Sequence, residues 1–119
     1  MVMEWHKARG YHFVAMSDHN TLEHKEKWKN ISSSPVLLQS YEKYLARFGK
    51  EWVETKEDTG GIRVRLKTFE EYCPLFEKKG RFLIIPSEEI SDKYDSRPVH
   101  LNALNLREVI RPQKGESVA

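Results

Sequence analysis

The sequence predicts an α/β fold with parallel strands. Two nearly continuous apolar runs, at residues 11–16 and 82–85, have the length and composition of strands buried in a parallel sheet. Each run directly follows a helical pattern that ends at a glycine, Gly10 in the first case and Gly80 in the second. Because both helix-to-strand connections are short, we expect the two strands to lie side by side in the same orientation.

Composition indicates one soluble globular unit and excludes several classes of protein. The 119 residues include three Trp, five Tyr and five Phe, which is too many apolar anchors for a disordered chain. Charged residues interrupt every apolar stretch well before the ~20 residues that a membrane-spanning helix needs. Residues 1–10 lack the apolar core of a signal peptide. The single Cys73 excludes an internal disulfide, and a net charge of +2 is too small to imply a nucleic-acid partner.

The first part of the chain is expected to form a helix, a strand and a polar segment. Residues 2–9 favour a short helix that ends at Gly10. The apolar strand at 11–16 stops at four consecutive polar residues, 17–20. The Lys-rich residues 21–30 are expected to form a loop or a short helix.

A helix and a β-hairpin are expected over residues 35–67, as an excursion from the parallel layer. Ser34 suits the N-cap and Pro35 the first position of a helix over residues 35–48. Apolar side chains recur there at helical spacing: Leu37, Tyr41, Leu45 and Phe48. Residues 52–67 then read as a hairpin, because an Asp-Thr-Gly-Gly turn separates two strand-like segments.

The last part of the chain is expected to contain a helix and two more strands. Residues 68–79 favour a helix, since Thr68 begins a capping-box pattern. The strand at 82–86 is followed by two glutamates, residues 91–97 are expected to form a loop, and 99–104 a third strand. The polar tail from residue 111 extends over residues 116–119, which lie outside the residues that the structure describes.

Acidic and imidazole side chains follow the buried strands. Asp18 and His19 come after the first, Glu88 and Glu89 after the second, and His100 lies near the start of the third. The carboxyl ends of parallel strands meet at one edge of a sheet, which is where such folds place their functional groups. Histidine and carboxylate without cysteine suit divalent Zn, Mn or Fe. The sequence therefore indicates a metal site.

Three segments resemble motifs of the PHP (polymerase and histidinol phosphatase) superfamily of metallohydrolases. Residues 10–20, GYHFVAMSDHN, resemble its apolar strand that runs into Thr-Asp-His. Residues 82–91, FLIIPSEEIS, resemble its strand that runs into Pro-Gly-x-Glu, and residues 98–103, PVHLNA, resemble a later strand that carries a histidine. The three segments follow one another in the family's order.

The resemblance implies a fold, a site and an activity. The fold would be part of a distorted PHP-type (β/α) barrel, with residues 1–119 as a single partial domain. His19, Glu89 and His100 would be metal ligands, and Asp18 would be a catalytic carboxylate near the metal. A complete domain would hold two or three ions and use metal-activated water to hydrolyse a small-molecule phosphoester. Substrate, metal identity, oligomeric state and localisation stay open.

The sequence departs from the family in its missing ligands. It has neither the initial His-x-His strand nor the final Asp-x-His. The chain is therefore expected to be an internal fragment of a longer enzyme. The alternative is a non-catalytic binding module on a degenerate scaffold of this kind.

The remaining candidate residues favour structural interpretations. Glu88, His6 and His24 are expected to be exposed, and His12 to pack rather than ligate. Cys73 is expected to be an unreactive packed thiol. The basic face of the hairpin (Arg63, Arg65 and Lys67) can contact phosphate, but is expected to be solvated.

Overall fold

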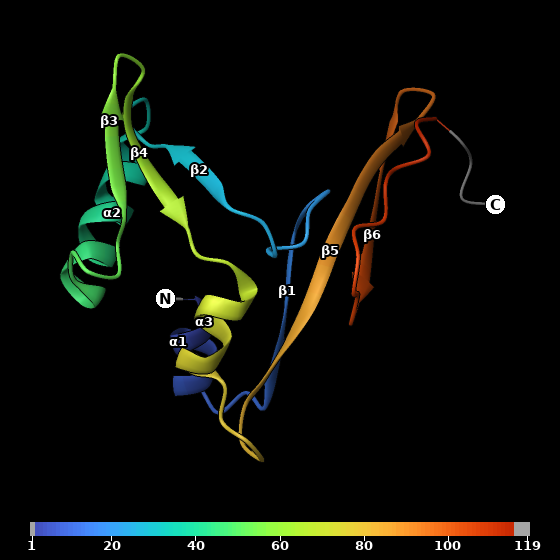
Figure 1. Ribbon diagram of the computed structural model, residues 1–119. Coiled ribbons are helices and arrows are strands. Elements are labelled where there is room, and N and C mark those ends of the chain that lie inside the picture. The colour runs from blue at the N-terminus through green and yellow to red at the C-terminus, as the bar shows by residue number, and fades with distance from the viewer. Residues whose placement is uncertain (1, 116–119) are drawn as a thin grey trace. The chain divides into compact units, whose positions relative to one another are not determined.

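The computed structural model describes residues 2–115, which divide into two compact units (Figure 1). The first unit comprises Glu26–Thr68. The second comprises Val2–Lys25 together with the chain from Phe69. None of the helices among the described residues combines the length and the apolar character that crossing a bilayer demands.

The first unit is a three-stranded antiparallel sheet with one helix. Its strands are β2 (Lys27–Asn30), β3 (Thr55–Asp58) and β4 (Gly61–Leu66), in the order β2-β4-β3. Helix α2 (Pro35–Phe48) packs apolar side chains against a core of Ile31, Val53 and Val64. The helix has the predicted bounds, and β3 and β4 form the predicted hairpin. Its turn requires glycine at position 61, where φ is +103° and a Cβ atom would collide with the side chain of Ser32.

Helix α2 begins at the predicted N-cap. The Ser34 hydroxyl oxygen accepts a hydrogen bond from the backbone N–H of Leu37 at 3.4 Å. We expect Ser34→Ala to lower the free energy of unfolding by about 1 kcal/mol, because this N–H then loses its partner in the first turn. Urea denaturation followed by circular dichroism measures the change. Ser33→Ala is the matched control, since Ser33 is exposed and precedes the cap; an equal loss in both variants contradicts the capping role.

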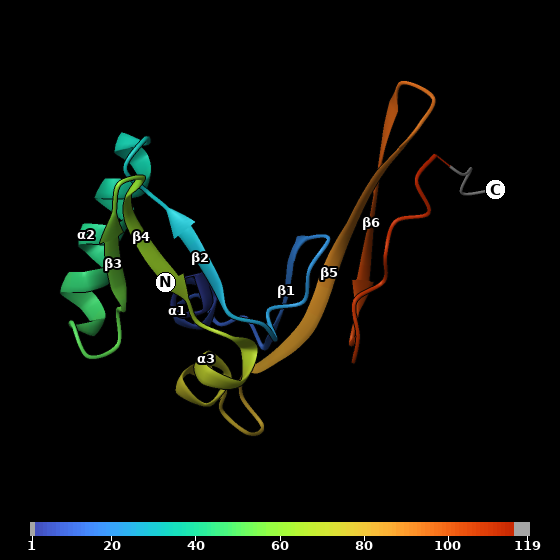
Figure 2. The same cartoon turned by 45° about the horizontal axis from the view of Figure 1, so that its top comes forward.

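The second unit is built on a different three-stranded sheet, in the order β1-β5-β6. Its elements are α1 (Val2–Ala8), β1 (Phe13–His19), α3 (Phe69–Phe76), β5 (Leu83–Tyr94) and β6 (Arg97–Leu104). Strand β1 is parallel to β5, as predicted, and the long β5 lies between β1 and β6 (Figure 2). Buried apolar side chains come from the helices, the strands and their connections: Met3, Leu22, Tyr72, Phe76, Phe82 and Ile84.

The prediction of a partial PHP-type (β/α) barrel is wrong. The described residues form two small open sheets and three short helices, with no closed barrel. Strand β6 is antiparallel to β5, not parallel to it. The reason is the length of the connection: only Asp95 and Ser96 separate the two strands. A parallel neighbour needs a crossover of a dozen or more residues, whereas two residues suffice for a hairpin. The positive φ of Asp95, 53°, suits such a tight turn.

Two polar segments, one predicted as a loop and the other as a loop or a short helix, contain strands. Residues 91–94 continue β5 and pair with β6, and residues 27–30 form β2 against β4. Helix α3 is shorter than predicted and ends at Phe76. In the two polar strand segments, residues 27–30 and 91–94, a neighbouring strand satisfies the backbone hydrogen bonds. This pairing outweighs the low strand propensity of the polar side chains.

Candidate metal centre

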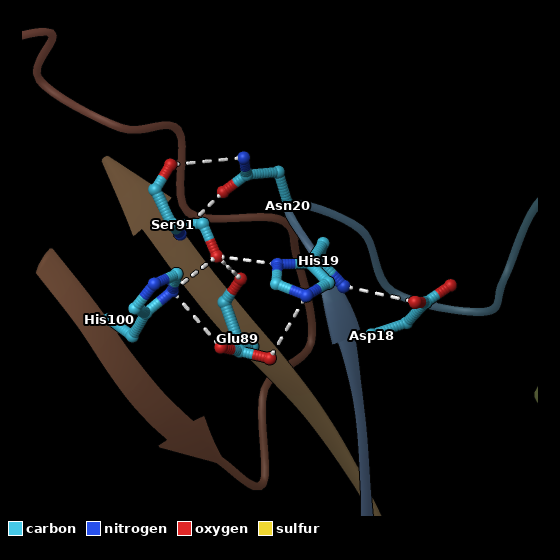
Figure 3. Close-up of polar contacts among 6 residues, drawn as sticks. All are labelled: Asp18, His19, Asn20, Glu89, Ser91 and His100. Carbon is cyan, nitrogen blue, oxygen red and sulfur yellow. Dashed lines mark hydrogen bonds and ion pairs between the residues drawn. The ribbon is translucent and has the colours of Figure 1, made fainter. Parts of the chain in front are cut away.

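Strand register brings His19, Glu89 and His100 together on one face of the β1-β5-β6 sheet. In the parallel pair, His19 of β1 lies opposite Glu89 of β5. In the antiparallel pair, His100 of β6 lies opposite Ser91, two residues after Glu89. Because side chains two residues apart on a strand share a face, all three groups point to the same side. Figure 3 shows the two rings on either side of the Glu89 carboxylate.

The Glu89 carboxylate contacts both imidazole rings through different oxygens. His19 Nε2 lies 3.5 Å from Glu89 Oε2, and His100 Nδ1 lies 3.1 Å from Glu89 Oε1. The two rings meet edge to face, with centroids 5.9 Å apart. One potential ligand atom from each residue lies within 4.8 Å of the other two. This donor set of two ring nitrogens and a carboxylate fits a borderline divalent ion such as zinc.

The cluster is open to solvent on the side of its histidines. The side chains of His19 and His100 are 64% and 48% exposed, whereas that of Glu89 is 27% exposed. The carboxylate is therefore the more protected partner, and the rings form the accessible rim. Such an arrangement leaves room for a further ligand to approach the ring nitrogens.

The structure does not bring Asp18 to this cluster. Asp18 belongs to β1 and lies opposite Glu88, so its side chain is on the other face of the sheet from His19. Its Oδ1 accepts a hydrogen bond from the backbone N–H of His19 at 3.0 Å, and the carboxylate points away from the three candidate ligands (Figure 3). The expectation of a catalytic carboxylate near the metal assumed that Asp18 and His19 follow the strand as loop residues, whereas both are still within it.

Two polar residues that sequence reasoning missed adjoin the cluster. The Ser91 hydroxyl lies 2.7 Å from His19 Nδ1 and 3.0 Å from His100 Nδ1. Asn20 bonds the backbone of Ser91 twice, donating through Nδ2 to its carbonyl at 3.1 Å and accepting its N–H at 2.8 Å. Ser91 shares the two-residue period of Glu89, a signal that the predicted loop over residues 91–97 concealed.

The other histidines lie outside the cluster. His6 Nδ1 contacts the carbonyl of Val2, and His24 Nδ1 contacts the Glu70 carboxylate. His12 lies beside shallow hollows at the other end of β1, next to Gly10 and Phe82. These placements separate all three rings from the candidate metal ligands.

Glu88 is fully buried, so the prediction of an exposed charge is wrong. Its exposed fraction is 0%, and Oε2 accepts a hydrogen bond from the backbone N–H of Ile110 at 2.8 Å. The residue was expected to lie in a loop after the strand. In fact β5 continues through it, which turns Glu88 to the face opposite Glu89.

Neither Cys73 nor the basic face of the hairpin is well suited to be an alternative reaction centre. Burial, followed by the nearby Glu77 carboxylate, raises the pKa of the Cys73 thiol to about 11, so the reactive thiolate is scarce near neutral pH. The hairpin cations are paired within their own unit: Arg63 with Asp58, and Arg65 and Lys67 with Glu54. A substrate phosphate would have to compete with these carboxylates.

Comparison of the chain with protein-family models, with curated proteins and with solved structures gives no match. The functional argument therefore stands on the geometry of the three candidate ligands and on the chemistry of their donor atoms.

Proposed function

We propose that this chain binds a divalent metal ion through His19, Glu89 and His100, and that the centre hydrolyses a small-molecule phosphoester in the manner of PHP-type metallohydrolases. The observation that carries the proposal is the convergence of two imidazoles and a carboxylate, from three separate strands, to within 4.8 Å. Three ligands and an open position are the usual protein contribution to a catalytic zinc site.

The chain contributes charge and orientation to this centre. A divalent ion supplies Lewis acidity toward a phosphoryl oxygen and lowers the pKa of a bound water to about 7. Two neutral imidazoles and one carboxylate offset only part of the charge of such an ion, so the loaded site attracts a phosphate dianion. Because the side chains of His19 and His100 are exposed, such a substrate can reach the site from solvent.

Metal titration tests the proposal directly. Chelator-treated protein is titrated with Zn²⁺, Mn²⁺ and Fe²⁺, the bound metal is quantified, and turnover of p-nitrophenyl phosphate is followed with each ion. We expect weak binding of at most one ion per chain, because three ligands serve one ion, and slow, metal-dependent turnover. Failure of all three ions to bind contradicts the proposal.

The placement of Asp18 favours a second function, a module that binds metal without catalysis. Its carboxylate is turned away from the cluster, which removes the expected acid–base group from the reacting side. Stoichiometric metal binding with no turnover above that of the free ion would identify this function rather than hydrolysis.

A further inference from the structure

Ser91 touches both histidines of the candidate metal centre. It lies on the same face of β5 as Glu89 and directly opposite His100 of β6. Its hydroxyl oxygen is 2.7 Å from His19 Nδ1 and 3.0 Å from His100 Nδ1, and 3.4 Å from the backbone carbonyl of Glu89 (Figure 3). The hydroxyl therefore contacts Nδ1 of His19, the ring nitrogen that does not face Glu89.

The backbone of Ser91 is held in place from the neighbouring strand. Asn20 follows His19 directly, and its side-chain amide pairs with both the N–H and the C=O of Ser91. The backbone N–H of Asn20 also donates to the Glu89 carbonyl at 2.9 Å. These three hydrogen bonds fix the end of β1 against β5. The same bonds therefore position both the Ser91 side chain and the His19 ring.

Metal binding at Nε2 requires His19 to carry its proton on Nδ1, where the Ser91 hydroxyl can accept it. A neutral imidazole has one N–H and one lone pair, and only the lone pair binds a metal. His19 Nε2 faces Glu89 at 3.5 Å and is the nitrogen available to an ion held there. When Nδ1 carries the proton, it donates to Ser91 Oγ, and the Ser91 proton is left for one of two acceptors, His100 Nδ1 at 3.0 Å or the Glu89 carbonyl at 3.4 Å.

We propose that Ser91 is a positioning residue of the metal centre, which accepts the Nδ1 proton of His19 and so presents the Nε2 lone pair toward Glu89. The inference rests on the proposed metal-binding function. Hydrogen-bond partners of this kind orient ligand histidines, and their loss typically lowers metal affinity 10- to 100-fold.

Histidine NMR and zinc titration test the inference separately. In ¹⁵N-labelled metal-free protein, two-bond ¹H–¹⁵N spectra distinguish the Nδ1–H from the Nε2–H form of His19. We expect Ser91→Ala to lower the share of the Nδ1–H form of His19 and to lower zinc affinity 10- to 100-fold. Ser91→Thr keeps the hydroxyl and should restore both. Ser17→Ala is the matched control, because Ser17 is an exposed serine on the same face of β1.

The outcomes separate the role of Ser91 from the metal centre. Unchanged tautomer and zinc affinity in Ser91→Ala, in a protein whose zinc site is otherwise intact, overturn the role of Ser91 alone. Absence of zinc binding by the unchanged protein overturns the metal centre itself. Failure of Ser91→Thr to restore the tautomer, with a native-like backbone spectrum, overturns the assignment of the effect to the hydroxyl.

Discussion

Replacing Glu89 with glutamine is expected to weaken zinc binding by more than about 100-fold, beyond the range typical for the loss of an outer-shell partner. Each Glu89 oxygen faces one histidine, Oε2 toward His19 and Oε1 toward His100. Glutamine keeps a single oxygen, presents an NH₂ group to one of the rings, and removes the only negative charge of the three candidate ligands. Isothermal titration with Zn²⁺ measures the loss, and any metal-dependent turnover should fall with it.

Asp18→Asn is the matched control for this experiment. Asp18 is also an acidic residue near the end of its strand, but its carboxylate lies on the opposite face of the sheet. We expect its zinc affinity to equal that of the unchanged protein. Equal losses in Asp18→Asn and Glu89→Gln would point to a general charge effect, and no loss in Glu89→Gln would remove Glu89 from the site.

The sequence predicted the convergence of the three candidate ligands better than the fold that produces it. The parallel pairing of the two apolar strands, and with it the meeting of His19 and Glu89, follows from their uninterrupted apolar runs. His100 joins them for a different reason from the one expected. It belongs to an antiparallel strand, and a two-residue turn folds it back beside Glu89.

The long polar end of β5 accounts for most of the wrong predictions. Residues 87–94 contain serine, glutamate, aspartate and lysine, which resemble a loop when local propensity alone is considered. Pairing with β1 on one side and β6 on the other keeps them extended. Once they are extended, alternation decides which side chains reach the site: Glu89 and Ser91 do, and Glu88 does not. Local propensity does not distinguish Glu88 from Glu89, and only the resemblance to the Pro-Gly-x-Glu motif selected Glu89 from the sequence.

The buried carboxyl group of Glu88 is expected to reduce the stability of the second unit. Its side chain is 0% exposed, and Oε1 has no hydrogen-bond partner among the described residues, although Oε2 accepts the N–H of Ile110. Asp18 lies opposite it on the same face, so a second acidic side chain adjoins the first. A buried polar atom without a partner costs about 1–3 kcal/mol.

We therefore expect Glu88→Met to raise the free energy of unfolding by about 1 kcal/mol. Methionine fills a similar volume without a buried carboxyl group, and water can replace the lost acceptor of the N–H of Ile110, which is an exposed residue. Glu88→Gln is the matched control: it keeps an oxygen that can accept the Ile110 N–H and removes only the acid. Urea denaturation of the three proteins measures both effects, and we expect glutamine to lie between glutamate and methionine. Zinc affinity should be unchanged, since residue 88 faces away from the candidate ligands. A marked loss of stability in both variants would show that the carboxyl group has a stabilising partner, and would refute the view that burying it is a net cost to the fold.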